Sequence, residues 1–259
     1  MKGRIVKVLS SRVAVAGSLL IATMGVTHAE EVSHPFVAPV FRFGSSDVQN
    51  DQVVENPDGS FTMSGTDGSV AAGWVLGWNI SVDYDPFING SLTLTNFSSS
   101  AHNYKLTLDL PVSAFGPASV YGGSLTATVF DDSGDSAAKL GLSTASDASP
   151  GIYQGTIDGI RVLSLFGGIG CEGSGPHCSS TLSTDDGLPG PTIPGPAVNG
   201  RIGTILMFNL SAGDRVVFDM NFTVSAFPTP VPLPASAWTL LAAMGCMGYL
   251  LVSRRRAAA

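Results

Sequence analysis

Positively charged residues are scarce in the central part of this sequence. Of the 13 Lys and Arg residues, four lie near the start and three stand together near the end, which leaves six for the long stretch between them. All 20 Asp and Glu residues fall between Glu30 and Asp219, so this stretch carries a net charge of about −14. A surface this acidic repels phosphate backbones, and no basic stripe opposes the repulsion. Nucleic-acid binding is therefore excluded as a function class.

Cysteine is also rare, with three residues in the whole chain. Cys171 and Cys178 lie close together, and outside the cytoplasm, where disulfides persist, we predict that they form a structural disulfide. A metal site that adds His177 is the alternative, but it lacks the fourth protein ligand that structural zinc uses. Cys246 lies in an apolar run and is interpreted as a small apolar side chain rather than a reactive thiol.

The usual signatures of catalysis are missing. The sequence has no Gly-x-Ser-x-Gly elbow, and its central histidines have no partner pattern around them. Asp83 and Asp85 lie one strand period apart, but they resemble a glycosidase pair only in being two acids. We therefore predict a protein that is not an enzyme and uses no cofactor.

One acidic segment is a candidate for calcium. Asp131, Asp132 and Asp135 in DDSGD follow a predicted strand and offer several carboxylate oxygens, which calcium prefers as ligands. Their spacing does not match the long calcium loop with its distant glutamate. Because Asp and Gly favour turns by themselves, we interpret the segment as a solvated turn, keep calcium as the weaker alternative and predict no metal site.

A convincing helical period is also missing from the central part, where apolar residues alternate with small or polar ones. The segments WVLGWNISVDY, YKLTLDL and RVVFDMNFTV follow this period of two, and TILMFNL precedes the last of them across the turn SAGD, which predicts a hairpin. GSLTLTNF, GSLTATVF and IDGIRVLSL are further strand candidates between turn residues. Many short strands predict an all-β fold, an antiparallel β-sandwich. The stretch 167–200 is so rich in Gly, Pro and Ser that we predict a long irregular loop.

Long apolar runs occur only at the two ends. The run at 235–252 contains no charge and is long enough to cross a bilayer at about 18 residues, with Trp238 and Tyr249 near its two ends. Arg254, Arg255 and Arg256 follow it, and positive charge favours the cytoplasmic side. We therefore predict one C-terminal transmembrane helix.

The N-terminus has the pattern of a secretory signal peptide. Basic residues at the start precede the apolar stretch VAVAGSLLIATMGV, and small residues come before a predicted cut ahead of Glu30. An uncut first anchor is the alternative, which the short apolar region disfavours. We predict three parts: a signal peptide at 1–29, a β-rich exported domain at 30–227 and a C-terminal signal at 228–259.

The C-terminal part resembles a PEP-CTERM sorting signal in the form that reads VPLPAS, with Leu in place of the more common glutamate. The motif is followed by the apolar helix and by Arg254, Arg255 and Arg256, and it consists of Val231, Pro232, Leu233, Pro234, Ala235 and Ser236. Proteins with such signals are substrates of exosortases, membrane enzymes of Gram-negative bacteria, and are associated with exopolysaccharide, biofilm and floc formation. The resemblance implies exosortase and the secretion machinery as partners. It also implies transient anchoring in the inner membrane before release to the cell surface or matrix.

Prolines give this motif a physical role. They disfavour helix and sheet, so they keep the segment before the membrane helix extended and open to a processing enzyme.

Three functions follow as hypotheses. The first is a non-enzymatic surface or extracellular-matrix protein, associated with exopolysaccharide. The second is a carbohydrate-binding module in which Trp74, Trp78 and Tyr84 stack on sugar rings, because a strand places alternate residues on one face. The third, a secreted hydrolase, ranks last because the sequence shows no paired acids or triad that would converge in a pocket. A single-pass membrane protein that keeps its anchor permanently is the alternative to processing in the first hypothesis.

Overall fold

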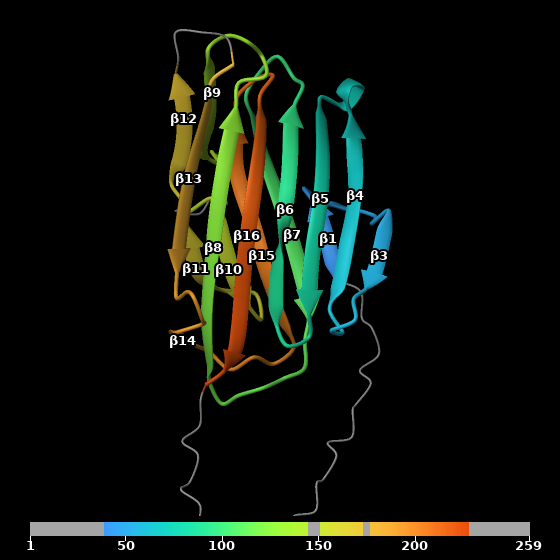
Figure 1. Cartoon of the computed structure of the whole chain (residues 1–259), viewed down its shortest axis with the longest axis vertical. Helices are drawn as coiled ribbons and strands as arrows, with labels where there is room; N and C mark the ends of the chain where they lie inside the picture. Colours follow the sequence, from blue (N-terminus) through green and yellow to red (C-terminus); the bar gives the residue numbers. More distant parts are fainter. Residues whose placement is uncertain (1–38, 145–150, 173–176, 228–259) are drawn as a thin grey trace, which may run out of the picture. The chain divides into compact units, whose positions relative to one another are not determined.

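Two antiparallel β-sheets make up the computed structural model, which describes residues 39–144, 151–172 and 177–227 (Figure 1). The one helical element in these ranges is a single 3-10 turn, η1, at Val70–Ala72. This confirms the predicted all-β sandwich. No helix in the described ranges is both long and apolar enough to span a bilayer. The predicted signal peptide and the predicted C-terminal helix lie outside the described residues.

The first sheet has a branched strand order. Its main path runs β11-β10-β15-β7-β1-β2, and β9 joins β15 beyond the end of β10, with β12 paired to β9. The strands are β1 (Val40–Phe43), β2 (Ser46–Asp47), β7 (His102–Pro111), β9 (Ala137–Leu142), β10 (Tyr153–Ile157), β11 (Ile160–Leu165), β12 (Gly168–Glu172) and β15 (Arg201–Leu210).

The second sheet runs in the order β13-β8-β16-β6-β5-β4-β3, and β14 continues the same edge of β8 that pairs with β13. Its strands are β3 (Gln52–Glu55), β4 (Phe61–Ser69), β5 (Trp74–Asp83), β6 (Phe87–Asn96), β8 (Ser119–Phe130), β13 (Ser179–Asp186), β14 (Ile193–Gly195) and β16 (Arg215–Ala226).

Alternating side chains explain why these strands form a sandwich. In β5, Leu76, Trp78, Ile80 and Val82 are buried while their neighbours are more exposed, as the period of two predicts. The same pattern recurs in β7 and β16. The buried faces of the two sheets meet in one apolar cluster, which supplies the main driving force for folding.

The two sheets are in close contact where glycine occupies an inward position. A side chain at Gly155 of β10 would collide with the ring of Phe222 on β16, and one at Gly123 of β8 would lie 2.5 Å from Leu163 on β11. Nearby, the hydroxyl of Tyr153 donates to the carbonyl of Asn221 in the opposite sheet at 2.9 Å. Small residues thus allow contact here, and a tyrosine hydroxyl links the layers.

The predicted hairpin of TILMFNL and RVVFDMNFTV is wrong, although both segments are strands. β15 pairs with β7, β9 and β10 in the first sheet, whereas β16 pairs with β6 and β8 in the second. The SAGD turn therefore carries the chain from one sheet to the other. Both strands have a buried and an open face, so alternation alone cannot distinguish a hairpin from two strands facing each other across the core.

The predicted irregular loop at 167–200 is also wrong in much of its length. It contains β12, β13 and β14, which pair with β9 and β8. Sheet pairing uses backbone groups that Gly and Ser also carry, and the single Pro in these strands lies in the three-residue β14. These strands flank the sheets, where few side chains need to be apolar.

Segments that pass between the sheets gather at one end, which we call the crossing end. β6, β8 and β15 end there, and β7, β13 and β16 begin there (top of Figure 1). At this end the chain crosses between the sheets after β6, β8, β12 and β15, and its other crossings follow β2, β7 and β14. Most of the acidic and cysteine residues singled out by sequence lie at this end.

Candidate functional site

The predicted sorting motif, Val231–Ser236, and the Arg254–Arg256 cluster lie outside the described residues, as does Cys246. They remain predictions. The described candidates are the disulfide, the acidic segment after β8, the aromatic residues of β5 and a groove beside β9.

Cys171 and Cys178 form a disulfide, as predicted, with their Cα atoms 6.0 Å apart. Cys171 lies in β12 of the first sheet, and Cys178 directly precedes β13 of the second. The backbone N–H of Asp131 donates to the carbonyl of Cys178 at 2.9 Å. The disulfide therefore joins the edges of the two sheets, a role that the sequence did not indicate.

Asp131 is a buried structural acceptor. It is 1% exposed, and its carboxylate accepts hydrogen bonds from the backbone N–H groups of Gly134, Ser136 and His177 and from the hydroxyl of Ser133. Burial by itself raises the pKa of Asp131, but these hydrogen bonds outweigh it and hold the pKa below its ordinary value. The carboxylate is thus occupied by protein donors.

The other two acidic residues of this segment have different partners. Asp132 forms an ion pair with Arg215 at 2.7 Å, and the guanidinium of Arg215 also lies 4.2 Å from the ring centre of Phe130. Asp135 accepts from the N–H of Ala137 at 3.0 Å. Within the described ranges, no three His, Cys, Asp or Glu side chains are grouped so that they can hold a metal ion. The geometry is that of a hydrogen-bonded turn.

Asn96 is a buried polar residue that sequence reasoning missed. It is fully buried, with its Nδ2 within 3.1 Å of the carbonyl oxygens of Ser100, Leu210 and Ser211. Its Oδ1 accepts from both the N–H and the hydroxyl of Ser98. The amide therefore ties the β6–β7 crossing to the β15–β16 crossing. The available signal was its place at an inward position of β6, where an apolar residue is expected.

Asp214 is the second buried residue that was missed. It is fully buried, accepts from the hydroxyl of Ser211 and receives a backbone hydrogen bond from Ser133. Its Oδ1 has no hydrogen-bond donor among the described residues. Burial, and then the charges of Asp131 and Asp135, raise the pKa of Asp214 above its ordinary value.

In wild type, ionisation of Asp214 should lower the free energy of unfolding as pH rises from mildly acidic to neutral, and we expect Asp214→Asn to remove this part of the pH dependence. A carboxyl whose pKa is raised by folding stabilises the fold below its unfolded pKa of 3.8, and this contribution is lost as pH rises through the folded pKa. The free energy of unfolding, measured by urea titration, should therefore fall less from pH 4 to pH 8 in the variant than in wild type. Asp219→Asn, at an exposed position of β16, is the matched control. An unchanged pH slope in Asp214→Asn would contradict the assignment.

The aromatic residues of β5 do not form an open row. Trp78 is 5% exposed, and its Nε1 donates to Asn50 at 2.9 Å. The Trp74 ring packs on Phe43 of the first sheet, with ring centres 4.3 Å apart, and Tyr84 is partly buried against the core. Trp74 and Trp78 pack against the first sheet and Tyr84 packs on Phe61, so the stacking platform expected for a carbohydrate-binding module is not present at these three residues.

Asp83 and Asp85 likewise serve a turn. The N–H of Asp85 donates to the Asp83 carboxylate at 3.0 Å, directly after β5 ends. This is an Asx-type turn, which Asp favours through a hydrogen bond to the backbone two residues on.

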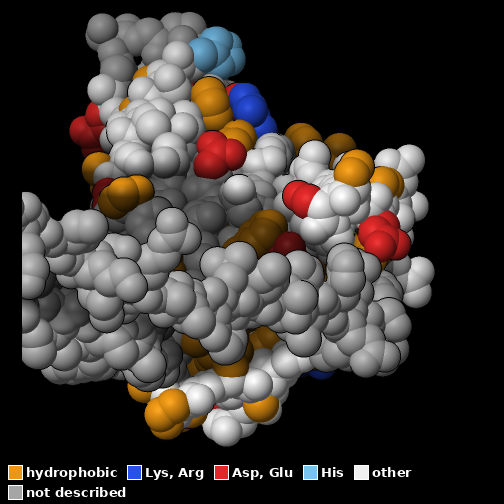
Figure 2. All heavy atoms as spheres, turned by 60° about the horizontal axis from the view of Figure 1, so that its bottom comes forward, with side chains coloured by type: hydrophobic (Ala, Val, Ile, Leu, Met, Phe, Trp, Pro, Cys, Tyr) orange, Lys and Arg blue, Asp and Glu red, His pale blue; other side chains and the backbone are white. Residues whose placement is uncertain are grey.

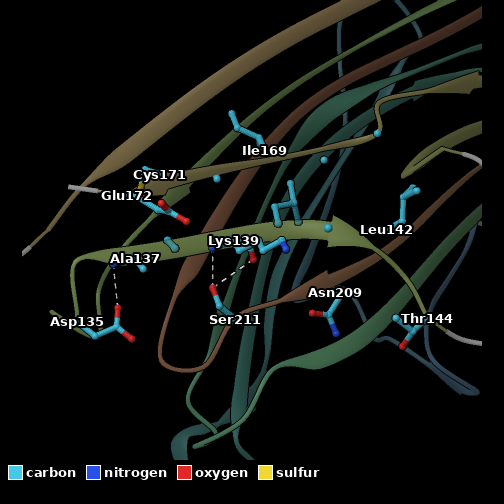
Figure 3. Close-up of a pocket in the computed structure, with 16 residues that line it drawn as sticks. Asp135, Ala137, Lys139, Leu142, Thr144, Ile169, Cys171, Glu172, Asn209 and Ser211 are labelled. Atoms are coloured by element: carbon cyan, nitrogen blue, oxygen red, sulfur yellow. Dashed lines mark hydrogen bonds between the residues drawn. The ribbon is translucent and has the colours of Figure 1, made fainter.

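A groove of about 980 Å³ lies beside β9 and β12, and sequence reasoning missed it (Figure 3). Its lining residues at Gly141, Gly168 and Gly170 carry no side chain, and no atom lies within 4 Å of the place a side chain would take at Gly141. Lys139 and Glu172 flank this glycine-lined part from the two paired strands. Glycine at neighbouring outward positions therefore creates a shallow hollow with charge of both signs.

Exposed apolar side chains are dispersed over the described surface. Val53 and Val54 share β3, and the other large ones lie on separate segments, for example Val70 on η1 and Ile160 on β11. Figure 2 likewise displays hydrophobic side chains in small groups, with acidic side chains at several separate places.

No protein-family model matches the chain, and a search of curated proteins finds no match.

Proposed function

We propose that this chain is a non-enzymatic protein of the cell surface or extracellular matrix of a Gram-negative bacterium, associated with exopolysaccharide. Residues 1–29 direct export, and an exosortase processes the signal at 228–259. The observation that carries the proposal is the order of three features at the C-terminus: VPLPAS, then an apolar run without charge, then three arginines.

The described domain supports export. Its disulfide is of a kind that persists in oxidising compartments and is rare in the cytosol. The candidate acids of the central part serve turns and crossings through hydrogen bonds and an ion pair. This arrangement favours a structural or binding role over catalysis.

We expect residues 226–259 to act as a transferable signal. Appended to an unrelated secreted reporter in the native host, they should cause cleavage and release, seen as a loss of mass in the reporter. Replacing Pro232 and Pro234 by alanine should block cleavage, because alanine lets the membrane helix extend over the motif. Replacing Arg254–Arg256 by neutral residues should instead weaken orientation in the membrane.

The controls separate three outcomes. A host strain without its exosortase should leave the reporter uncut, whereas equal processing in both strains would assign the cut to another protease. The intact mass of the native protein provides the second check. A mature form that still contains Arg254–Arg256 would show that the tail is not cut and would favour a permanent single-pass anchor.

A further inference from the structure

The outer face of the second sheet is an array of short polar side chains. Strand register places outward residues of six neighbouring strands in three rows across the sheet. All positions are Thr, Ser or Asn except Gly77, Val217, Asp219 and Asp185. The rows are Thr66–Gly77–Thr93–Val217–Thr128–Thr181, Ser64–Asn79–Ser91–Asp219–Thr126–Ser183 and Thr62–Ser81–Asn89–Asn221–Ser124–Asp185. We call this array the hydroxyl face.

Basic residues avoid the hydroxyl face. Within the described ranges five of the six lie on strands of the first sheet: Arg42, Lys105, Lys139, Arg161 and Arg201. The sixth, Arg215, lies on the outward face of β16 in the row next to Val217, and it is paired with Asp132. The three rows therefore carry two carboxylates and no basic side chain.

The face is ordered before any ligand arrives. Hydroxyl groups bond across neighbouring strands at 2.8 Å between Thr126 and Ser183 and at 2.9 Å between Thr128 and Thr181. Ser, Thr and Asn lose less conformational entropy on immobilisation than long Lys or Glu side chains. Strand spacing repeats donors and acceptors at about 4.8 Å across the sheet and about 7 Å along it.

Charge and polarity define the occupant. An anionic chain meets the carboxylates of Asp219 and Asp185, while the one basic side chain in the adjoining row, Arg215, is already paired with Asp132. A second copy stacked face to face would bring Asp219 and Asp185 of both copies into one contact. Docking of an apolar protein surface finds only Val217 among the three rows.

We propose that the hydroxyl face binds a neutral, hydroxyl-rich polysaccharide through many weak hydrogen bonds. This proposal names a ligand for the proposed matrix protein. It rests on the proposed function in one respect only, that the protein is located where it meets polysaccharide. A long neutral glycan presents periodic hydroxyl groups that both donate and accept, which matches an array of hydroxyl and amide groups. Repeated contacts along one chain add to a useful affinity although each is weak.

Affinity electrophoresis of the purified full-length protein in neutral detergent tests the proposal. Gels contain hydroxyethylcellulose, galactomannan, or the anionic polymer alginate. Wild type should be retarded by at least one neutral polymer and less by alginate. Because binding is measured on purified protein, failure of tail processing leaves this result unchanged.

Variants place the binding on the face. Asn79→Ala/Ser91→Ala/Thr126→Ala removes three polar groups from the row that contains Asp219 and should weaken binding about tenfold or more, since each lost hydrogen bond lowers the affinity about two- to tenfold. Asn89→Lys, at an exposed position, should weaken binding by obstructing the face and serves if the triple variant does not fold. Thr107→Ala on β7 of the first sheet is the matched control and should bind as wild type.

Three results would overturn the proposal. They are an unretarded wild type in both neutral polymers, equal retardation by alginate, and folded face variants that bind as wild type does.

Discussion

Gly155→Ala should lower the free energy of unfolding by about 3 kcal/mol or more. The added Cβ would lie 2.7 Å from Cδ2 of Phe222 and closer still to another carbon of the same ring. Phe222 is fully buried, so its ring has no free space into which to turn. The two sheets must therefore separate locally, which also strains the nearby hydrogen bond from Tyr153 to Asn221.

Urea unfolding followed by tryptophan fluorescence measures this effect. Gly141→Ala is the matched control, because no atom lies within 4 Å of its added Cβ and the residue is also in a strand of the first sheet. Its unfolding free energy should stay within about 0.5 kcal/mol of wild type. A Gly155→Ala protein as stable as the control would mean that the sheets are not in close contact at this point.

Removing the disulfide is the second change with a large expected effect. Cys171→Ser/Cys178→Ser should lower the free energy of unfolding by about 2.5 kcal/mol, the chain-entropy value for a closed loop of this length. Since the disulfide joins the edges of the two sheets, β12 and β13 should open first, and their amide protons should exchange faster than those of β5 and β6.

Cys246→Ser controls for cysteine removal as such and should leave stability unchanged. Free-thiol labelling provides the parallel check, because Cys171 and Cys178 should react only after reduction. Labelling of both cysteines in the unreduced native protein would contradict the disulfide, and unchanged stability of the double variant would contradict its structural role.

Local pattern predicted the strands well, because alternation is a property of neighbouring residues. β5, β7 and β16 lie where the period of two placed them, and the disulfide joins the two cysteines that their position suggested. The same reasoning did not predict which strands pair with each other. The alternation in β15 and β16 shows that each strand has one buried face. Two such strands can pair in a hairpin or lie in different sheets, so the alternation does not identify the pairing partner.

The acidic candidates illustrate a second limit. The sequence displayed Asp131, Asp132 and Asp135 as one group, and turn chemistry correctly favoured a turn. Their separate tasks depend on partners far along the chain, since Asp131 accepts from His177 and Asp132 pairs with Arg215. No local pattern contains such contacts.

What the sequence determined by itself is therefore the all-β class, the acidic body, the cysteine pair and most of the strand positions, because each depends on composition or on residues close in the chain. Only the tertiary structure decided which strands share a sheet, that 167–200 contains edge strands, and that Asn96 and Asp214 are buried at the crossing end. It also decided that short polar residues of six strands form one face. These properties arise from long-range backbone pairing, which depends on where a strand lies in the sheet and less on its own side chains.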